Sequence, residues 1–157
     1  MLISLCNKIK TDIMKHILVA IDFDTNEQKL LNVAFEFAHK FKAKLWLIHI
    51  TAPDPEFVGY DVGPQYIRDN RASELKREHK ILQDYANDLE KKGIKADGLL
   101  IQGATIDMIM EEADTLNVDL IAIGRLEHSF LYKAFFGSVT EKIVKTSDIP
   151  VLVVPLD

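Results

Sequence analysis

The sequence predicts an α/β protein in which a parallel sheet is covered by helices on both faces. Short apolar runs rich in β-branched residues alternate with segments whose apolar residues recur at helical spacing. Such alternation is typical of right-handed crossovers between parallel strands. The 157 residues, 48% hydrophobic and 27% charged, suit one compact domain with an ordinary core.

The first third of the chain contains two predicted strands and one helix. Residues 16–22, "HILVAID", form a short apolar run of the kind found in strands buried on both faces. Residues 24–26, "DTN", are helix-capping types, and a helical stripe follows them: Leu30, Ala34, Phe37, Ala38 and Phe41. Residues 44–50, "KLWLIHI", are the second strand.

Residues 51–66 are predicted to be a loop, because they hold three of the five prolines together with Gly59 and Gly63. A long helix is expected over 67–92, with Gly93 as its stop. Its apolar stripe comprises Leu75, Leu82, Tyr85, Ala86 and Leu89.

The remaining segments continue the alternation. Residues 95–101, "KADGLLI", are a third strand, which Gly98 weakens. A helix is expected over 105–117, with Thr105 as its cap. Two further strands are predicted, "DLIAIG" at 119–124 and "PVLVVP" at 150–155, and a helix opens between them at Ser138, Val139 and Thr140.

Composition restricts the partners and the compartment. A net charge of -5 creates no overall field that would attract nucleic acid or an anionic membrane, so we expect neither as a partner. The single cysteine, Cys6, excludes an intramolecular disulfide, and no apolar run approaches the roughly 18 residues of a membrane span. We expect a cytoplasmic protein.

Two predicted strand ends suggest a ligand site. Parallel sheets of this kind bind ligands beyond the carboxyl ends of their strands, where the strand order reverses. The first strand ends on Asp22 and the fourth on Gly124. If these strands are neighbours, the helix that opens at Ser138 lies beside them, and its free N–H groups would point at an anion.

Plainer interpretations of the same residues stand beside this one. Gly124 can be a strand terminator, Gly137 and Ser138 an ordinary helix start, and Asp22 a cap for the turn into the first helix. His49 and His128 fit packed or solvated positions better than catalytic ones, because neither has a partner at metal-ligand spacing.

Signatures of common enzymes are missing from the sequence. It contains no G-x-x-x-x-G-K-[ST] loop, no G-x-G-x-x-G turn and no H-E-x-x-H helix. "FFGSVTE" lacks the second glycine of a nucleophile elbow. No catalytic base can be named, so we do not expect a dedicated enzyme.

Four segments carry a resemblance to the universal stress protein family: "KHILVAIDFD", "AKLWLIHI", "DLIAIG" and "GSVTEKIVKTSDIPVLVVP". The resemblance implies a five-stranded, doubly wound parallel sheet of order 3-2-1-4-5. It also implies a domain over 15–157, preceded by an N-terminal extension over 1–14. The family's nucleotide-binding motif, G-x2-G-x9-G-[ST], matches Gly124, Gly137 and Ser138, with Glu127 in place of its second glycine.

The resemblance also implies a site for an adenine nucleotide, ATP or AMP, with Mg²⁺ as a possible companion ion. Asp22 would contact the ribose. Ala20 and Ile50 would line the adenine pocket, and Ile21, between Ala20 and Asp22, would belong to the same nucleotide site. The phosphates and ribose would be held by five residues: Gly124, Gly137, Ser138, Val139 and Thr140.

Glu127 is the departure from the motif. A carboxylate about 4 Å from a phosphate charge costs roughly 1 kcal/mol in water and about 4 kcal/mol at an effective dielectric near 20. Arg125, a bound Mg²⁺ or an outward-turned Glu127 would offset that cost.

Two functional classes follow. The first is a stress-response regulatory protein that binds an adenine nucleotide at the ends of strands one and four and at most hydrolyses ATP slowly. The second is a nucleotide-free interaction module of the same family that works as a homodimer. The dimer would pair through the last strand, at Val151, Leu152, Val153 and Val154, because an apolar edge is usually covered.

Overall fold

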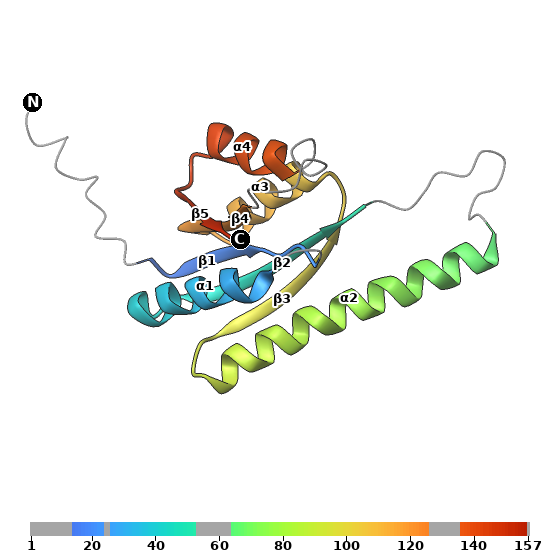
Figure 1. Cartoon of the computed structure of the whole chain (residues 1–157), viewed down its shortest axis with the longest axis horizontal. Coiled ribbons are helices and arrows are strands. Elements are labelled where there is room, and N and C mark those ends of the chain that lie inside the picture. The colour runs from blue at the N-terminus through green and yellow to red at the C-terminus, as the bar shows by residue number, and fades with distance from the viewer. Residues whose placement is uncertain (1–13, 24–25, 53–63, 126–135, 157) are drawn as a thin grey trace, which may run out of the picture.

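The computed structural model describes residues 14–23, 26–52, 64–125 and 136–156. Strands and helices alternate along the chain (Figure 1). The strands are β1 (His16–Ala20), β2 (Lys44–Thr51), β3 (Ala96–Gln102), β4 (Leu120–Arg125) and β5 (Val151–Pro155). The helices are α1 (Glu27–Phe41), α2 (Gln65–Lys91), α3 (Thr105–Thr115) and α4 (Phe136–Thr146).

The five strands form one sheet of order β3-β2-β1-β4-β5, and every neighbouring pair is parallel. The predicted order 3-2-1-4-5 is therefore confirmed. The order reverses at β1, which pairs with β2 on one side and with β4 on the other. Ligand sites of such sheets lie at this switch point, beyond the carboxyl ends of β1 and β4.

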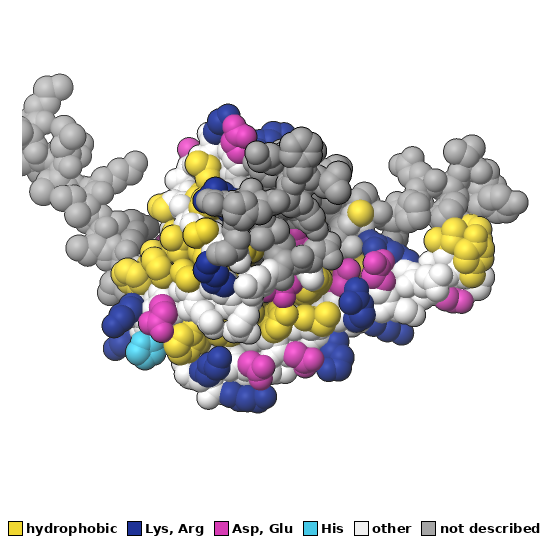
Figure 2. All heavy atoms as spheres, in the orientation of Figure 1, with side chains coloured by type: hydrophobic (Ala, Val, Ile, Leu, Met, Phe, Trp, Pro, Cys, Tyr) yellow, Lys and Arg dark blue, Asp and Glu magenta, His cyan; other side chains and the backbone are white. Residues whose placement is uncertain are grey.

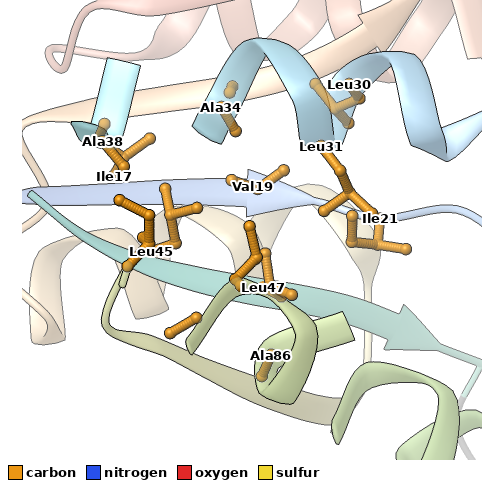
Figure 3. Close-up of a cluster of buried hydrophobic side chains, with 14 of the residues drawn as sticks. Ile17, Val19, Ile21, Leu30, Leu31, Ala34, Ala38, Leu45, Leu47 and Ala86 are labelled. Carbon is orange, nitrogen blue, oxygen red and sulfur yellow. The ribbon is translucent and has the colours of Figure 1, made fainter. Parts of the chain in front are cut away.

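Helices cover both faces of the sheet, as predicted (Figure 1). α1 and α2 pack on one face around Val19 and Leu47, which are fully buried. In Figure 3, Val19 of β1 and Leu47 of β2 lie between Ala34 of α1 and Ala86 of α2. α3 and α4 pack on the opposite face, around Ile48 and Ile121.

α2 approaches β3 so closely that only glycine fits at position 98. A Cβ atom there would lie 2.9 Å from Leu82 Cβ and 3.0 Å from the Leu82 backbone. The strand forms despite the glycine because this contact brings the buried side of α2 onto the sheet. Gly93 follows α2 with a φ of +86°, so the predicted stop at this glycine is confirmed.

Several predicted boundaries are wrong by one or two residues: β1 ends at Ala20 rather than Asp22, and α3 ends at Thr115 rather than Asn117. Thr51 belongs to β2, because β3 continues far enough to pair Gln102 with it. α2 begins at Gln65, directly after Pro64, whose extended backbone serves as the N-cap. α4 begins at Phe136, two residues before the predicted opening at Ser138.

The predicted caps also differ from the structure. Thr105 is the first residue of α3, and the N-cap is Ala104. Asn26 is the N-cap of α1, but its side chain makes no capping hydrogen bond. α1 is held instead through its first residue, as described below.

Charged side chains of both signs are interspersed over the face seen in Figure 2, which includes α1 and α2. Lys80 and Asp84 pair at 2.8 Å on the exposed side of α2. Within the described part of the chain, no helix is both long enough and apolar enough to cross a membrane. The absence of a nucleic-acid partner stays a prediction.

Candidate functional site

A cavity of about 200 Å³ lies at the carboxyl ends of β1, β2 and β4. We call it the switch-point cavity. Its lining comes from both faces of the sheet: Ala20, Ile21, Asp22, Leu30, Ile48, His49, Ile50, Thr105, Ile109, Ile123, Gly124, Val139 and Leu156. Small-molecule sites usually exceed roughly 300 Å³. Residues 126–135, which follow β4 in the sequence, are outside the described part of the chain.

Six of the nine predicted site residues line this cavity. They are Ala20, Ile21, Asp22, Ile50, Gly124 and Val139. The sheet brings them together because Ala20 pairs with Ile48 in β2 and with Ile123 in β4. Residues that are far apart in the sequence therefore meet at one edge.

The other three predicted residues belong to α4. Thr140 is buried, and its hydroxyl donates to the Gly124 carbonyl oxygen at 3.4 Å. Gly137 and Ser138 lie in the first turn of α4, but their side chains, like Glu127, are outside what the structure describes. Backbone N–H groups in the first turn of a helix have no partner within the helix. Val139 brings that turn to the cavity.

Asp22 is a half-buried carboxylate beside the cavity. It is not the N-cap of α1, since Asn26 occupies that position. The other polar side chains in the lining are His49 and Thr105, whereas most of the lining is aliphatic. Arg125 is exposed at the end of β4, next to Gly124. The cavity thus joins an apolar slot to a few polar groups at its rim.

Gly124 has a packing role that its spacing in the motif did not reveal. It lies inside β4, which continues to Arg125, so the terminator interpretation is wrong. A Cβ atom at this position would lie 2.4 Å from Leu156 Cδ1. The Leu156 side chain therefore occupies the space over Gly124 and closes one wall of the cavity.

A second wall is held by a hydrogen bond between α1 and α2. The Tyr85 hydroxyl donates to Glu27 Oε2 at 2.6 Å, and Glu27, the first residue of α1, is buried. Burial of Tyr85 and its hydrogen bond to the Glu27 carboxylate raise the pKa of Tyr85 to about 12. This contact fixes the start of α1 one turn before Leu30, which lines the cavity.

Sequence reasoning missed His49 as a site residue. His49 lines the cavity, and its Nδ1 lies 2.8 Å from the Ile21 carbonyl oxygen. The only available signal was its position at the end of a strand, which does not separate it from a packed histidine. Trp46 of β2 is half-buried and donates from Nε1 to His16 Nδ1 at 3.2 Å. His128 is outside the described residues.

Metal binding finds no support in the described side chains, among which no group of three or more His, Cys, Asp or Glu residues could hold an ion. The site therefore consists of an apolar slot, one carboxylate, one imidazole and the first turn of α4. Such a site can hold a flat apolar group next to hydroxyl groups and an anion.

The sheet order and the position of the cavity define a doubly wound α/β protein with its site at the switch point. The family model described as "Universal stress protein family" matches residues 14–155. The chain therefore belongs to the universal stress protein family.

Individual relatives agree with this assignment. The chain is 30% identical over 142 residues to universal stress protein YxiE of Bacillus subtilis, which covers 87% of this chain and 96% of that protein. It is similar in fold to a universal stress protein from Archaeoglobus fulgidus in complex with dAMP (TM-score 0.58, 21% identity, 90% and 98% of the two chains). It is also similar to a family protein from Arabidopsis thaliana with AMP bound (TM-score 0.61, 17% identity, 91% and 92%).

Proposed function

We propose that this protein binds an adenine nucleotide, AMP or ATP, in the switch-point cavity and acts as a stress-response regulator. The observation that carries the proposal is the meeting of Asp22, an aliphatic slot and the first turn of α4 at the carboxyl ends of β1 and β4. Two proteins of similar fold, from A. fulgidus and A. thaliana, are complexes with dAMP and AMP.

Each part of a nucleotide has a chemical counterpart at the site. Ala20, Ile50 and Ile123 offer apolar surface to the flat adenine ring. The Asp22 carboxylate can accept hydrogen bonds from ribose hydroxyls. The N–H groups of the first turn of α4, which includes Gly137 and Ser138, suit phosphate oxygens. With ATP, Mg²⁺ would neutralise part of the phosphate charge.

Glu127 is expected to weaken the site without abolishing it. A carboxylate in the loop after β4 should oppose the distal phosphates more than the α-phosphate. Glu127→Gly should therefore tighten ATP binding more than AMP binding. Ser138→Ala should weaken the binding of both nucleotides by about 1 to 3 kcal/mol, because it removes a hydrogen bond to a charged oxygen.

Calorimetric titration of the parent and both variants with each nucleotide tests the proposal. Ser73→Ala is a matched control, because the Ser73 hydroxyl bonds its own helix on α2, at the Asp69 carbonyl. Its affinities should equal those of the parent. Chromatography of denatured, freshly purified protein should also reveal a released adenine nucleotide. If the parent, Glu127→Gly and Ser138→Ala all fail to bind, the nucleotide proposal is wrong.

The second candidate function is a nucleotide-free, dimeric interaction module. It is favoured by β5, which lies at an edge of the sheet. Val151, Leu152 and Val153 in this strand are only half-buried, whereas Val154 is buried. An exposed apolar edge strand is usually covered, and a second copy of the chain would cover it. This function would hold if the protein forms a dimer, is purified without a bound nucleotide and binds none when AMP or ATP is added.

A further inference from the structure

His49 lies where the β1 ladder ends and the cavity begins. It is near the end of β2, is half-buried and lines the switch-point cavity. The register of β1 and β2 pairs Ala20 with Ile48, so the next position would pair Ile21 with His49. Ile21 continues the ladder with one bond, from its N–H to the Ile48 carbonyl oxygen at 2.8 Å.

The next bond of this ladder is made by a side chain. In a regular parallel pair, the Ile21 carbonyl oxygen would accept from the Ile50 N–H. It is instead within 2.8 Å of the His49 imidazole Nδ1. A carbonyl oxygen can only accept, so Nδ1 carries the hydrogen and donates it. The imidazole thus holds the backbone of β1 at the point where the chain leaves the sheet.

His49 also contacts the residue on the other side of Asp22. The rings of His49 and Phe23 have centroids 4.3 Å apart and planes inclined by 37°. The imidazole therefore fixes the residue before Asp22 through a hydrogen bond and the residue after it through ring packing. These two contacts restrict the direction in which the Asp22 side chain leaves the backbone.

We propose that His49 is a positioning residue that orients the Asp22 carboxylate toward a bound ribose. The inference rests on the proposed function, because it assigns His49 a role through the nucleotide contact of Asp22. His49 acts by preorganisation: a carboxylate already held in its binding direction loses less freedom when the ligand arrives. The role needs a donor at Nδ1 and an aromatic surface toward Phe23.

Two substitutions of His49 separate the contribution of its Nδ1 donor from that of its ring. His49→Phe keeps a ring against Phe23 but removes the donor, and AMP affinity should fall about 3- to 10-fold, as expected for one lost hydrogen bond. His49→Asn places an amide N–H near the position of Nδ1 and should bind AMP nearly as well as the parent. His79→Phe, at an exposed histidine on α2, is the control and should leave affinity unchanged.

A double-mutant cycle with Asp22→Asn distinguishes positioning from general support of the fold. Asp22→Asn should weaken AMP binding about tenfold or more, as expected for a lost hydrogen bond to a charged group. Adding His49→Phe to it should then change AMP affinity no further, because there is no carboxylate left to orient. If His49→Phe does not fold, His49→Leu takes its place in the cycle.

The calorimetric outcomes separate the two proposals. Three results would each overturn the role of His49 alone. His49→Phe could bind AMP as tightly as the parent, or His49→Asn could bind AMP as weakly as His49→Phe. The third result is that the effects of His49→Phe and Asp22→Asn on AMP affinity multiply fully in the cycle. If the parent, Glu127→Gly and Ser138→Ala bind neither AMP nor ATP, the proposed function is overturned and this inference with it.

Discussion

Replacement of Gly124 by alanine should destabilise the protein through a single contact. The added Cβ atom would lie 2.4 Å from Leu156 Cδ1 and 3.0 Å from Leu156 Cγ, well inside ordinary contact distance. Leu156 cannot move away freely, because it is 5% exposed and its N–H donates to the Arg125 carbonyl oxygen at 2.8 Å. The Leu156 side chain must therefore change its rotamer or push on its neighbours.

Overpacking of this kind costs about 1 to 3 kcal/mol in the free energy of unfolding. For a chain of this size, each kcal/mol lowers Tm by roughly 2 to 4 °C. Leu156→Ala alone should cost about 2 to 5 kcal/mol, because it leaves a cavity. In the double variant the alanine at position 124 has room, so the combined cost should be at least about 1 kcal/mol below the sum.

Urea denaturation followed by circular dichroism measures these free energies. Gly93→Ala provides a control, since a Cβ atom there meets nothing within 4 Å but the backbone has a φ of +86°. It should cost about 1 to 2 kcal/mol through backbone strain. Its effect should add to that of Leu156→Ala, because the two positions lie at opposite edges of the sheet. A Gly124→Ala protein as stable as the parent, or additive effects of Gly124→Ala and Leu156→Ala, would refute the reasoning.

Four further outcomes are expected. Replacing Val151 and Val153 by lysine should convert a β5-paired dimer into monomer in sedimentation, and an unchanged dimer would locate the interface elsewhere. Tyr85→Phe should lower the free energy of unfolding by about 1 to 3 kcal/mol, because buried Glu27 loses its donor. The raised pKa of Tyr85 contributes stability that is fully present below the ordinary pKa of 10 and is lost as pH rises toward about 12. The unfolding free energy of the parent should therefore fall between these two pH values. That of Tyr85→Phe should fall less, because it has no hydroxyl to titrate. Deleting residues 1–13 should leave the calorimetric Tm nearly unchanged, and a large drop would mean that the segment packs on the core.

The fold was predictable from the sequence because its signals are local. Apolar runs such as 16–22 mark buried strands, and helical stripes separate them. The strand order depended on resemblance to a family, since periodicity does not say which strands pair. The boundary errors have tertiary causes: Thr51 extends β2 because Gln102 of β3 pairs with it.

The site was predictable only in part. The carboxyl ends of β1 and β4 could be chosen because parallel topology brings strand ends together. The contacts of Leu156 with Gly124 and of His49 with Ile21 join residues 32 and 28 positions apart, and no spacing rule connects them. The sequence does not distinguish a glycine that makes room for a neighbouring side chain from a glycine that makes room for a ligand.

The length of α2 has a consequence for how the protein opens locally. The helix has 27 residues, about 40 Å at 1.5 Å per residue, and extends past the sheet in Figure 1. Its first buried residue is Glu78, and in the turns before it Arg71 donates to the Thr51 hydroxyl at 2.9 Å. Amide hydrogens in those turns can exchange with solvent by local fraying of the helix, whereas those around Leu82 exchange only when the core unfolds. We therefore expect the first three turns of α2 to open locally without opening the part of the helix that packs on the sheet beside the cavity.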